Sequence, residues 1–539
     1  MRKLNRGQQC IVYNVLGRMM KNERFDIFLS GGSGVGKSRV LQAVYQTLCR
    51  LMKGSDESGE PKNNIVVVGA YTGKAAFNVG GLTLHNIFHL PTKCFGKISP
   101  MAAAVLTKCK RTFNYTLLFI IDEISLVGSR VFGWIINRVN QMTELRASGE
   151  LNVSFLVVGD FAQLKPVQDN WIFKSIGQSN PVANILGNPN WVNFKLYELK
   201  EIMRQRDDKT FAETLRVIGE LGIEFCSKDQ IRLLDSRIID EYEPLNSIPD
   251  ETIILTHSNK CVKEFNEIRM RNSGKEIVEN VACDYAEGKD AKTPFAIKTA
   301  ESIKDRHLDE TQNLTGKLLL VLDKKYLLTK NLRTSDGLAH GNIGRLKRII
   351  YHKKQGRPNC TLVKRVYLQF EDPLIGAKSR QENKHASRDK PEENWTMIEC
   401  QDLTVKTSKV GKYDFHVNRV QLPLIESEAM TIHKSQGQTY SSVAVNIGDN
   451  LSQSLMYVAL SRATNVQGLY LFGARSILKK NHTTKSLHAL KQTRQSTATK
   501  LELDRLRKES MMTDLYPFIF TGKYKYRFNR IFVSSTILT

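Results

Sequence analysis

The segment Gly31-Gly-Ser-Gly-Val-Gly-Lys-Ser38 constrains the fold of this 539-residue chain more than any other feature. It fits the pattern G-x-x-x-x-G-K-[ST], whose glycines let backbone N–H groups close around phosphates. The run Phe25-Asp-Ile-Phe-Leu before it is typical of a strand, and the stretch from Arg39 to Leu51 after it is typical of a helix. A chance match is a poor alternative in that setting. The segment therefore predicts a parallel α/β domain with a phosphate-binding loop.

Two roles follow from the chemistry of this loop. Lys37 should neutralise the β- and γ-phosphate oxygens of a nucleotide, and the Ser38 hydroxyl should hold Mg²⁺. Further nucleotide contacts are expected from Gly31, Gly34, Val35, Gly36 and Arg39. By itself the loop is also compatible with kinases, GTPases and transporters, so other residues must narrow the class.

An acidic pair ends a later strand. The run Leu117-Leu-Phe-Ile-Ile-Asp-Glu places Asp122 and Glu123 at the carboxyl end of a predicted buried strand. A metal-binding Asp belongs there in phosphate-loop enzymes, so we expect Asp122 to hold Mg²⁺ and Glu123 to act as general base for the attacking water. The alternative for Glu123 is a helix-start carboxylate favoured by the helix dipole. The phosphate-binding loop favours catalysis.

Three more polar residues are candidates for the same site. Gln163, in Val158-Gly-Asp-Phe-Ala-Gln-Leu-Lys-Pro-Val167, could contact the γ-phosphate. Arg204 in Ile202-Met-Arg-Gln and Arg462 in Tyr457-Val-Ala-Leu-Ser-Arg could stabilise charge on the transferring phosphoryl group. An isolated arginine is more often a solvated surface residue, so these roles depend on the wider motif set.

The alternation of apolar runs and helical stretches predicts several domains. A second α/β pattern begins near Leu199, and short strands from about residue 312 to 410 interrupt it. We predict a first domain at 1–198 with a wedge-like insertion at about 91–112, a second domain at 199–311 and 411–475, a small β-domain at 312–410 inserted in it, and a basic C-terminal extension at 476–539. For the basic residues of the wedge region and of the extension, nucleic-acid contact and a solvated surface are comparable alternatives.

The charge balance favours a polyanionic partner. Lys and Arg total 79 against 54 for Asp and Glu, which gives a net charge of +25. Nucleic acid is the leading candidate, although a ribosome-associated or merely basic surface is equally compatible with charge alone. No apolar run approaches the ~18 residues of a membrane span, so no membrane partner is expected. Without an apolar signal region at the start, we expect an intracellular protein, nuclear if eukaryotic or viral.

Taken together in this order, the motifs resemble those of a superfamily 1B helicase of the petite-integration-frequency (Pif) type, related also to RecD and to Helitron helicases. The resemblance spans roughly residues 4 to 472. Its motifs are Leu4-Asn-Arg-Gly-Gln8, Ala70-Tyr-Thr-Gly-Lys-Ala-Ala-Phe, Gly80-Gly-Leu-Thr-Leu-His85, Asp122-Glu-Ile-Ser, Gly159-Asp-Phe-Ala-Gln, Met203-Arg-Gln-Arg-Asp, Gly337-Leu-Ala-His-Gly-Asn-Ile-Gly344, Ala429-Met-Thr-Ile-His-Lys-Ser-Gln-Gly-Gln-Thr439 and Tyr457-Val-Ala-Leu-Ser-Arg462. His340 replaces the usual Asn of its motif, and no departure touches the ATP chemistry. No nuclease domain precedes Met1, so we expect the helicase alone.

The resemblance implies two RecA-like domains with ATP between them, a β-barrel-like insertion in the second and a wedge in the first. Lys37 and Asp122 would lie on one face of the cleft, and Arg204 and Arg462 on the other. Gln8 would read adenine, and Gly437 and Gln438 would add nucleotide contacts. The resemblance implies strand contacts in the first domain from Thr72, Lys74, Thr83 and His85, and in the second domain from Thr431, His433 and Lys434.

The resulting prediction is an ATP- and Mg²⁺-dependent DNA helicase that moves 5′-to-3′ on single-stranded DNA and unwinds forked duplexes in replication, repair or recombination. The polarity comes from the family alone. The alternative is a nucleic-acid-stimulated ATPase that remodels RNA or protein complexes without processive unwinding. We expect a monomer, whose candidate protein partners are single-stranded-DNA-binding and replication proteins.

Overall fold

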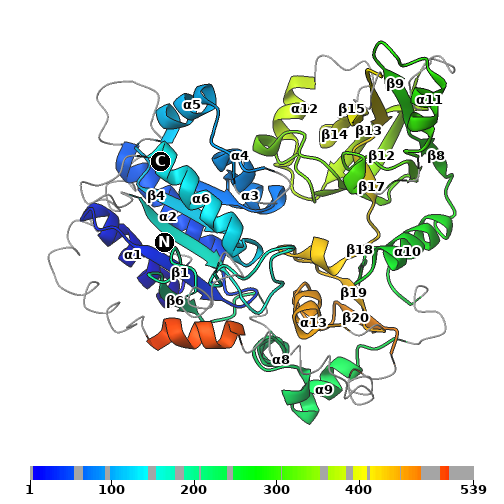
Figure 1. The fold of residues 1–539 in the computed structure, drawn as a ribbon. Coiled ribbons are helices and arrows are strands. Elements are labelled where there is room, and N and C mark those ends of the chain that lie inside the picture. The colour runs from blue at the N-terminus through cyan, green and yellow to red at the C-terminus, as the bar shows by residue number, and fades with distance from the viewer. Residues whose placement is uncertain are drawn as a thin grey trace.

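The structure is a computed structural model, and it describes most of the chain. The described residues are 4–53, 65–91, 98–113, 115–143, 153–175, 187–204, 208–239, 247–304, 306, 308–352, 362–383, 392–408, 413–448, 451–474, 477 and 498–508. They form a first lobe, a second lobe and a β-rich insertion, which Figure 1 shows at the left, at the lower right and at the upper right.

A six-stranded parallel sheet forms the centre of the first lobe, with strand order β3-β2-β4-β5-β1-β6. Its strands are β1 (Asp26–Gly31), β2 (Val66–Ala70), β3 (Leu82–Thr83), β4 (Leu118–Asp122), β5 (Ser154–Gly159) and β6 (Lys195–Leu199). Strand β5 lies between β1 and β4, so the phosphate-binding loop and the acidic pair lie at the same edge of the sheet, formed by the carboxyl ends of the strands, with one strand between them. This is the edge at which parallel sheets bind ligands.

Helices cover both faces of this sheet. They are α1 (Arg6–Met20), α2 (Lys37–Lys53), α3 (Gly73–Asn78), α4 (Leu84–Phe88), α5 (Ala103–Phe113) and α6 (Ser129–Met142), with a 3₁₀ turn η1 (Ile124–Leu126). Alternating β1 side chains enter opposite cores, since Phe28 packs with the α4–α6 side while Ile27 and Leu29 pack with α1 and α2. Burial on both faces explains why the strands read as continuous apolar runs.

The second lobe contains a four-stranded parallel sheet of order β18-β7-β19-β20. Its elements are β7 (Ile253–Thr256), β18 (Ala429–Thr431), β19 (Val443–Asn446), β20 (Leu469–Phe472), α8 (Lys209–Glu220), α9 (Lys228–Asp235), α10 (Asn259–Arg271), α13 (Gln453–Leu460), η2 (Ile223–Phe225) and η5 (Ile432–Ser435). The predicted fold class, two parallel-sheet α/β domains with a β insertion in the second, is confirmed.

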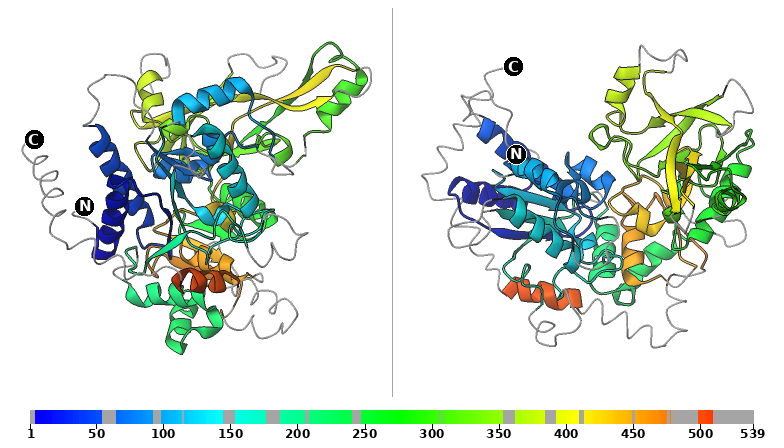
Figure 2. Two further views of the ribbon diagram at one scale, coloured as in Figure 1. Left: turned by 60° about the vertical axis from the view of Figure 1, so that its left-hand side comes forward. Right: turned by 45° about the horizontal axis from the view of Figure 1, so that its top comes forward.

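The insertion consists of antiparallel sheets between β7 and β18. Its elements are β8 (Val278–Val281), β9 (Cys283–Glu287), α11 (Pro294–Glu301), η3 (Leu308–Glu310), β10 (Lys317–Leu320), β11 (Lys325–Leu328), η4 (Thr334–Asp336), β12 (Ile343–Tyr351), β13 (Val363–Phe370), α12 (Ala377–Asn383), β14 (Trp395–Glu399), β15 (Gln401–Ser408), β16 (Phe415–Gln421) and β17 (Leu424–Glu426). Strands β9, β16 and β15 form an arm that projects from the molecule (Figure 2, left).

The insertion is larger than the predicted range 312–410. Strand β9 pairs with β16, so that Cys283 lies opposite Val420, and both residues are outside that range. Strand β17 pairs with β11 and also belongs to the insertion. We therefore propose boundaries near residues 276 and 427 in place of 312 and 410.

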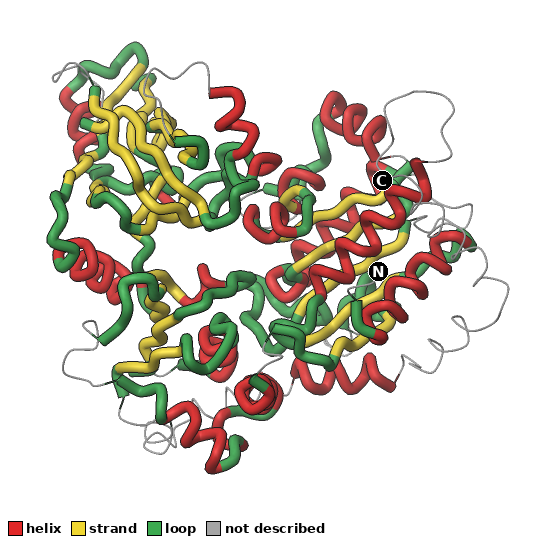
Figure 3. Tube along the Cα trace, turned by 180° about the vertical axis from the view of Figure 1, so that it is seen from behind, coloured by secondary structure: helices red, strands yellow, loops and turns green. Residues whose placement is uncertain are grey.

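A helix at residues 498–508 returns from the end of the second lobe to the first lobe. It is the orange-red helix of Figure 1, and the view from behind in Figure 3 also places it against the first lobe. Leu506 is fully buried in the first-lobe core, and the Trp191 Nε1–H donates to Glu502 Oε1 at 2.9 Å. The described part of the C-terminal extension is thus attached to the protein surface, while most of residues 476–539 lie outside the described part of the chain.

Candidate active site

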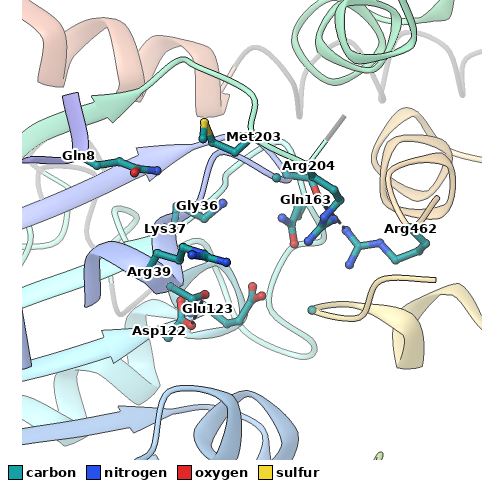
Figure 4. A pocket seen from close by; sticks show the side chains of 14 residues that line it. Gln8, Gly36, Lys37, Arg39, Asp122, Glu123, Gln163, Met203, Arg204 and Arg462 are labelled. Carbon is teal, nitrogen blue, oxygen red and sulfur yellow. Dashed lines mark hydrogen bonds between the residues drawn. The ribbon is translucent and has the colours of Figure 1, made fainter. Parts of the chain in front are cut away.

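A cavity of about 580 Å³ lies between the two lobes at the carboxyl ends of β1, β4 and β5. This is an ordinary size for a nucleotide or cofactor site. Figure 4 shows side chains from both lobes directed into it. The residues that line it are Gln8, Ser33, Gly34, Gly36, Lys37, Ser38, Arg39, Asp122, Glu123, Gln163, Met203, Arg204, Gly437 and Arg462.

The loop between β1 and α2 has the backbone geometry of a phosphate cradle. Gly34 and Gly36 have φ values of +85° and +84°, a conformation that other residues rarely adopt. A Cβ at Gly36 would also lie 2.5 Å from Gln8 Nε2. Lys37 Nζ donates to the carbonyls of Gly31 at 2.7 Å and Gly32 at 2.9 Å, which holds the ammonium over the loop. The loop leads into the N-terminus of α2, where helix N–H groups and the dipole favour an anion.

Asp122 and Ser38 provide oxygen atoms suited to Mg²⁺. The Ser38 hydroxyl lies 3.5 Å from Asp122 Oδ2, while Asp122 Oδ1 accepts the backbone N–H of Glu123 at 2.9 Å. Burial raises the pKa of Asp122 to about 7, and the adjacent Glu123 charge adds to this. A divalent cation would offset both effects. Since Mg²⁺ commonly takes one or two protein oxygens besides phosphates, the pair fits the ion.

Glu123 occupies a strained backbone position. Its φ of 54° and ψ of 46° are left-handed, which is uncommon outside glycine. In Figure 4 its carboxylate extends into the cavity, away from that of Asp122. Gly437 of the second lobe lies so close that a Cβ there would be 3.4 Å from Glu123 Oε1. The Asp122 carboxylate thus lies beside Ser38, where a metal ion would be held, whereas the Glu123 carboxylate extends into the cavity.

Gln8 is buried and already engaged at both ends of its amide. Its Oε1 accepts the backbone N–H of Asn5 at 3.0 Å as part of the helix cap, and its Nε2 donates to the Val35 carbonyl at 2.9 Å. Gln8 therefore fastens α1 to the phosphate-binding loop at the edge of the cavity. Its reading of adenine stays a prediction.

The two arginines are held differently from the expectation that both belong to the second lobe. The Gly34 carbonyl accepts the backbone N–H groups of Met203 at 2.9 Å and Arg204 at 3.0 Å, so Arg204 is attached to the phosphate-binding loop of the first lobe. Its Nη1 donates to Ser33 Oγ at 2.9 Å and to the Ser461 carbonyl at 3.1 Å, which spans the interface. Arg204 therefore belongs to the first lobe, because these two backbone hydrogen bonds fix the segment that carries it to the phosphate-binding loop.

Arg462 is the arginine that the second lobe supplies. It is buried, and its guanidinium donates to the carbonyls of Val458 at 2.8 Å and Gln438 at 2.9 Å. Its Nη2 also reaches Ser33 Oγ at 3.4 Å. Burial, followed by the charge of Arg462, lowers the pKa of Arg204 to about 10, and burial also lowers the pKa of Arg462. With a pKa of about 10, the Arg204 guanidinium is charged near neutral pH.

Three predicted nucleotide contacts do not line the cavity. Gly31 contributes its carbonyl to Lys37, and Val35 contributes its carbonyl to Gln8. The Gln438 side chain is buried, where it bonds to the Lys434 carbonyl and to Tyr440. Conversely, Ser33 and Met203 line the cavity without having been predicted. Both stand inside quoted motifs, at positions where the motif does not require their residue type.

The expected strand contacts of the first lobe follow β2 and β3. Thr72 and Thr83 are N-caps of α3 and α4, and their hydroxyls accept backbone N–H groups at 3.3 and 3.4 Å. Thr83 is buried, so it can act on a strand only through the loop that it holds. His85 packs edge-on against Tyr71, and burial lowers its pKa. Lys74 is half-buried beside the insertion, where burial lowers its pKa to about 8 against the opposing charge of Glu371.

The expected contacts of the second lobe lie at the end of β18. Thr431 caps η5 by accepting the backbone N–H of Lys434, while the side chains of His433 and Lys434 are exposed. The pKa of His340 in the insertion is lowered by burial and next by the charge of Lys434. A Cβ at Gly341 would lie 3.8 Å from Lys74 Cβ. The insertion loop 337–344 therefore lies close to contact residues of both lobes.

The predicted wedge falls partly outside the described residues, including Lys93 and Lys97. Its described part contains α5, which buries Cys109 and Phe113 against the first lobe and exposes Lys108, Lys110 and Arg111. This basic face is available to a polyanion, but no contact distinguishes it from a solvated surface. Its role as a wedge stays a prediction.

Comparison with known proteins decides the family. The family model described as PIF1-like helicase matches residues 3–221, and that described as the viral superfamily 1 RNA helicase core domain matches residues 254–470. Over most of its length the chain is similar to Pif1-type helicases of superfamily 1. The family resemblance drawn from the motifs is thereby confirmed.

Curated Pif1 helicases match most of this chain. The ATP-dependent DNA helicase Pif1 of Campylobacter jejuni is 25% identical over 472 residues, which cover 84% of this chain and 90% of the relative. The human ATP-dependent DNA helicase PIF1 is 26% identical over 457 residues, which cover 84% of this chain and 59% of the relative. The chain thus spans nearly all of the bacterial relative and about three-fifths of the human one.

Crystal structures of Pif1 helicases share the fold. The Candida albicans Pif1 structure aligns with a TM-score of 0.58 at 22% identity and covers 89% of this chain and 97% of its own. The Bacteroides Pif1 structure in complex with ADP-AlF3 and single-stranded DNA aligns with a TM-score of 0.58 at 18% identity and covers 92% and 97%. At these identities the likeness establishes the arrangement of lobes and insertion.

No helix in the described part of the chain is long and apolar enough to cross a membrane.

Proposed function

We propose that this Pif1-type helicase hydrolyses ATP to move 5′-to-3′ along single-stranded DNA and to separate forked duplexes in replication, repair or recombination. One observation carries the proposal. The cavity joins a phosphate-binding loop and two carboxylates of the first lobe to Arg462 of the second lobe, so a nucleotide bound there contacts both lobes. Relatives named ATP-dependent DNA helicases support the substrate and the track.

The proposed chemistry uses residues that already face one another. Lys37 would exchange its bonds to the Gly31 and Gly32 carbonyls for phosphate oxygens, since charge-assisted bonds are stronger. Glu123 would accept a proton from water as the water oxygen bonds to the γ-phosphorus and the bond to the β-γ bridging oxygen breaks. Ser38 and Asp122 would hold Mg²⁺, which would supply charge neutralisation at the phosphates.

Hydrolysis would become movement because the nucleotide favours one arrangement of the lobes. Arg462 gains phosphate contacts only while the second lobe is closed on the first, so ATP favours closure and loss of the γ-phosphate favours opening. Lys74 and His85 would contact the strand from the first lobe, and His433 and Lys434 from the second. Phosphate contacts of this kind give little base specificity, which suits a motor.

Polarity and track are tested with forked duplexes that carry a single 5′ or 3′ tail, with Lys37→Ala as the control. We expect ATP-dependent separation of the 5′-tailed fork only, and none with Lys37→Ala. Wild-type protein that hydrolyses ATP yet separates neither fork would exclude a helicase and favour the remodelling ATPase. Separation of the 3′-tailed fork alone would reverse the polarity.

An RNA track is the second candidate, because the second half of the chain matches an RNA helicase core. The same 5′-tailed fork with an RNA tail tests it. Faster separation of that fork would assign the motor to RNA.

We further propose an intracellular location, nuclear in a eukaryotic or viral setting, and a monomeric state in solution. A related structure concerns forked duplex DNA and two coordinating Pif1 helicases, so the number of chains per fork should be measured by light scattering.

A further inference from the structure

A row of hydrogen bonds behind the cavity crosses the lobe interface repeatedly. The backbone N–H of Ser33 in the phosphate-binding loop donates to Tyr457 Oη at 2.8 Å, and that hydroxyl donates to Asp160 Oδ2 at 2.9 Å. Gln163 Nε2 donates to the same Asp160 oxygen at 3.3 Å. Ser33, Asp160 and Gln163 belong to the first lobe, whereas Tyr457 stands on α13 of the second.

The row continues into the second lobe beyond Gln163. Gln436 Nε2 donates to Gln163 Oε1 at 3.2 Å, so both ends of the Gln163 amide are engaged. Leu164, the next residue, packs in the hydrophobic core of the second lobe with Phe211 and Tyr457. The loop that carries the predicted γ-phosphate contact is therefore held by second-lobe side chains as well as by the first-lobe core, in which Phe161 packs against Phe28.

The Tyr457 hydroxyl has a fixed position and a fixed direction of donation. Its ring is buried against Gly219 of α8, where a Cβ would lie 2.9 Å from a ring atom, and a Cβ at Gly32 would lie 3.3 Å from the hydroxyl. Burial, together with the Asp160 charge, raises the pKa of the phenol well above its usual value, so the proton stays on the oxygen and points to Asp160. Fully satisfied buried networks of this kind hold their members rigidly.

We propose that Tyr457 is a positioning residue for ATP hydrolysis, whose hydroxyl sets the distance between the phosphate-binding loop at Ser33 and the Asp160–Gln163 loop. Ser33 and Gln163 both line the nucleotide cavity, so this bridge fixes two of its walls relative to each other. Because the bridge comes from the second lobe, Gln163 is placed for the γ-phosphate only while that lobe is closed. The proposal rests on the proposed ATP hydrolysis.

The test replaces the hydroxyl alone. Tyr457→Phe keeps the ring and removes both hydrogen bonds, so we expect KM for ATP to change less than twofold and DNA-saturated kcat to fall about tenfold, because misplacement by about 1 Å can cost on the order of 100-fold. Tyr326→Phe is the matched control, since the buried Tyr326 hydroxyl in the insertion also accepts a backbone N–H, that of Val321 at 2.7 Å, and donates to a carbonyl, that of Leu319 at 2.8 Å. We expect its kcat within twofold of wild type.

A double-mutant cycle separates positioning from general weakening of the interface. If Tyr457 acts through Gln163, then Tyr457→Phe should lower kcat less than twofold when Gln163→Ala is already present. Effects that multiply, a wild-type kcat in Tyr457→Phe, or equal losses in Tyr457→Phe and Tyr326→Phe would each overturn the proposal. Absence of ATP hydrolysis by the wild-type protein would instead remove the proposed function itself.

Discussion

The nucleotide cavity and the strand-contact positions differ in how their side chains are held. In and directly behind the cavity, hydrogen bonds join Ser33 to Arg204, Arg462 and Tyr457, and those to Arg462 and Tyr457 run from one lobe to the other. The predicted strand-contact residues instead lie at separate places, after β2 and β3 in the first lobe and after β18 in the second. The difference corresponds to two tasks, because a phosphoryl transfer needs a fixed geometry, whereas a track of repeated phosphates can be bound by separate and roughly additive contacts.

The largest effect should come from the cavity, through Arg204. Arg204→Ala removes a half-buried guanidinium that bonds to Ser33 and to the Ser461 carbonyl, and we expect kcat to fall roughly 100- to 1000-fold as for other lost charge-stabilising donors. DNA affinity should stay within about twofold, because no expected strand contact is touched. Steady-state ATPase and fluorescence anisotropy measure the two quantities.

The control for that variant is Arg216→Ala, since Arg216 forms exposed ion pairs with Glu213 and Glu220 on α8 of the second lobe. Its turnover should match wild type. If Arg204→Ala weakens DNA binding as much as it lowers turnover, the cavity and the predicted strand contacts do not act separately, and the comparison fails.

A smaller effect is expected on the strand face. Lys434→Ala should weaken single-stranded DNA binding several-fold and reduce the salt slope of the affinity by about 0.7, the value for one phosphate contact on a single strand. Turnover at saturating DNA should be retained. Lys260→Ala removes another exposed lysine of the second lobe, one whose side chain is 86% exposed on α10, and should change neither quantity. Equal salt slopes for wild type and Lys434→Ala would remove Lys434 from the strand face.

Much of the cavity could be predicted from sequence because its first-lobe half is local. The predicted runs from Phe25 to Leu29 and from Leu117 to Ile121 are short, apolar and followed by functional residues. The observed strands Asp26–Gly31 and Leu118–Asp122 agree with them closely. The attachment of Arg204 to Gly34 was missed, because no spacing rule links a loop to a crossover about 170 residues later in sequence. Tyr457 stood in a quoted motif, but its partner Ser33 is 424 residues away.

The boundaries proposed for the insertion differ from the predicted ones for the same physical reason. Strand β9 has its partner β16 more than 100 residues later, where Cys283 lies opposite Val420. Periodicity identifies a strand but not its partner. The strand-contact set depended on the family resemblance, and only the structure shows that Thr83 and Thr431 are buried helix caps rather than open contacts.

The smallest effect, a pH dependence, would sharpen the comparison because it isolates one strand contact. Burial beside the insertion lowers the pKa of Lys74 from 10.5 to about 8, so its side chain is a cation below pH 8 and loses that charge as the pH rises toward 9. The pKa values of His85, His340 and His433 are lowered from 6.5, so these side chains do not gain or lose a charge between pH 7 and pH 9.

Single-stranded DNA affinity should therefore fall a few-fold from pH 7 to pH 9 at constant ionic strength, roughly the loss of one phosphate contact. Lys74→Arg keeps a cation at every pH in this range, so its affinity should stay flat. In the cavity, Arg204 keeps its charge because its pKa of about 10 lies above the range. If the affinities of wild type and Lys74→Arg change with pH in the same way, Lys74 does not contact the strand, and its charge serves only its contact with Glu371.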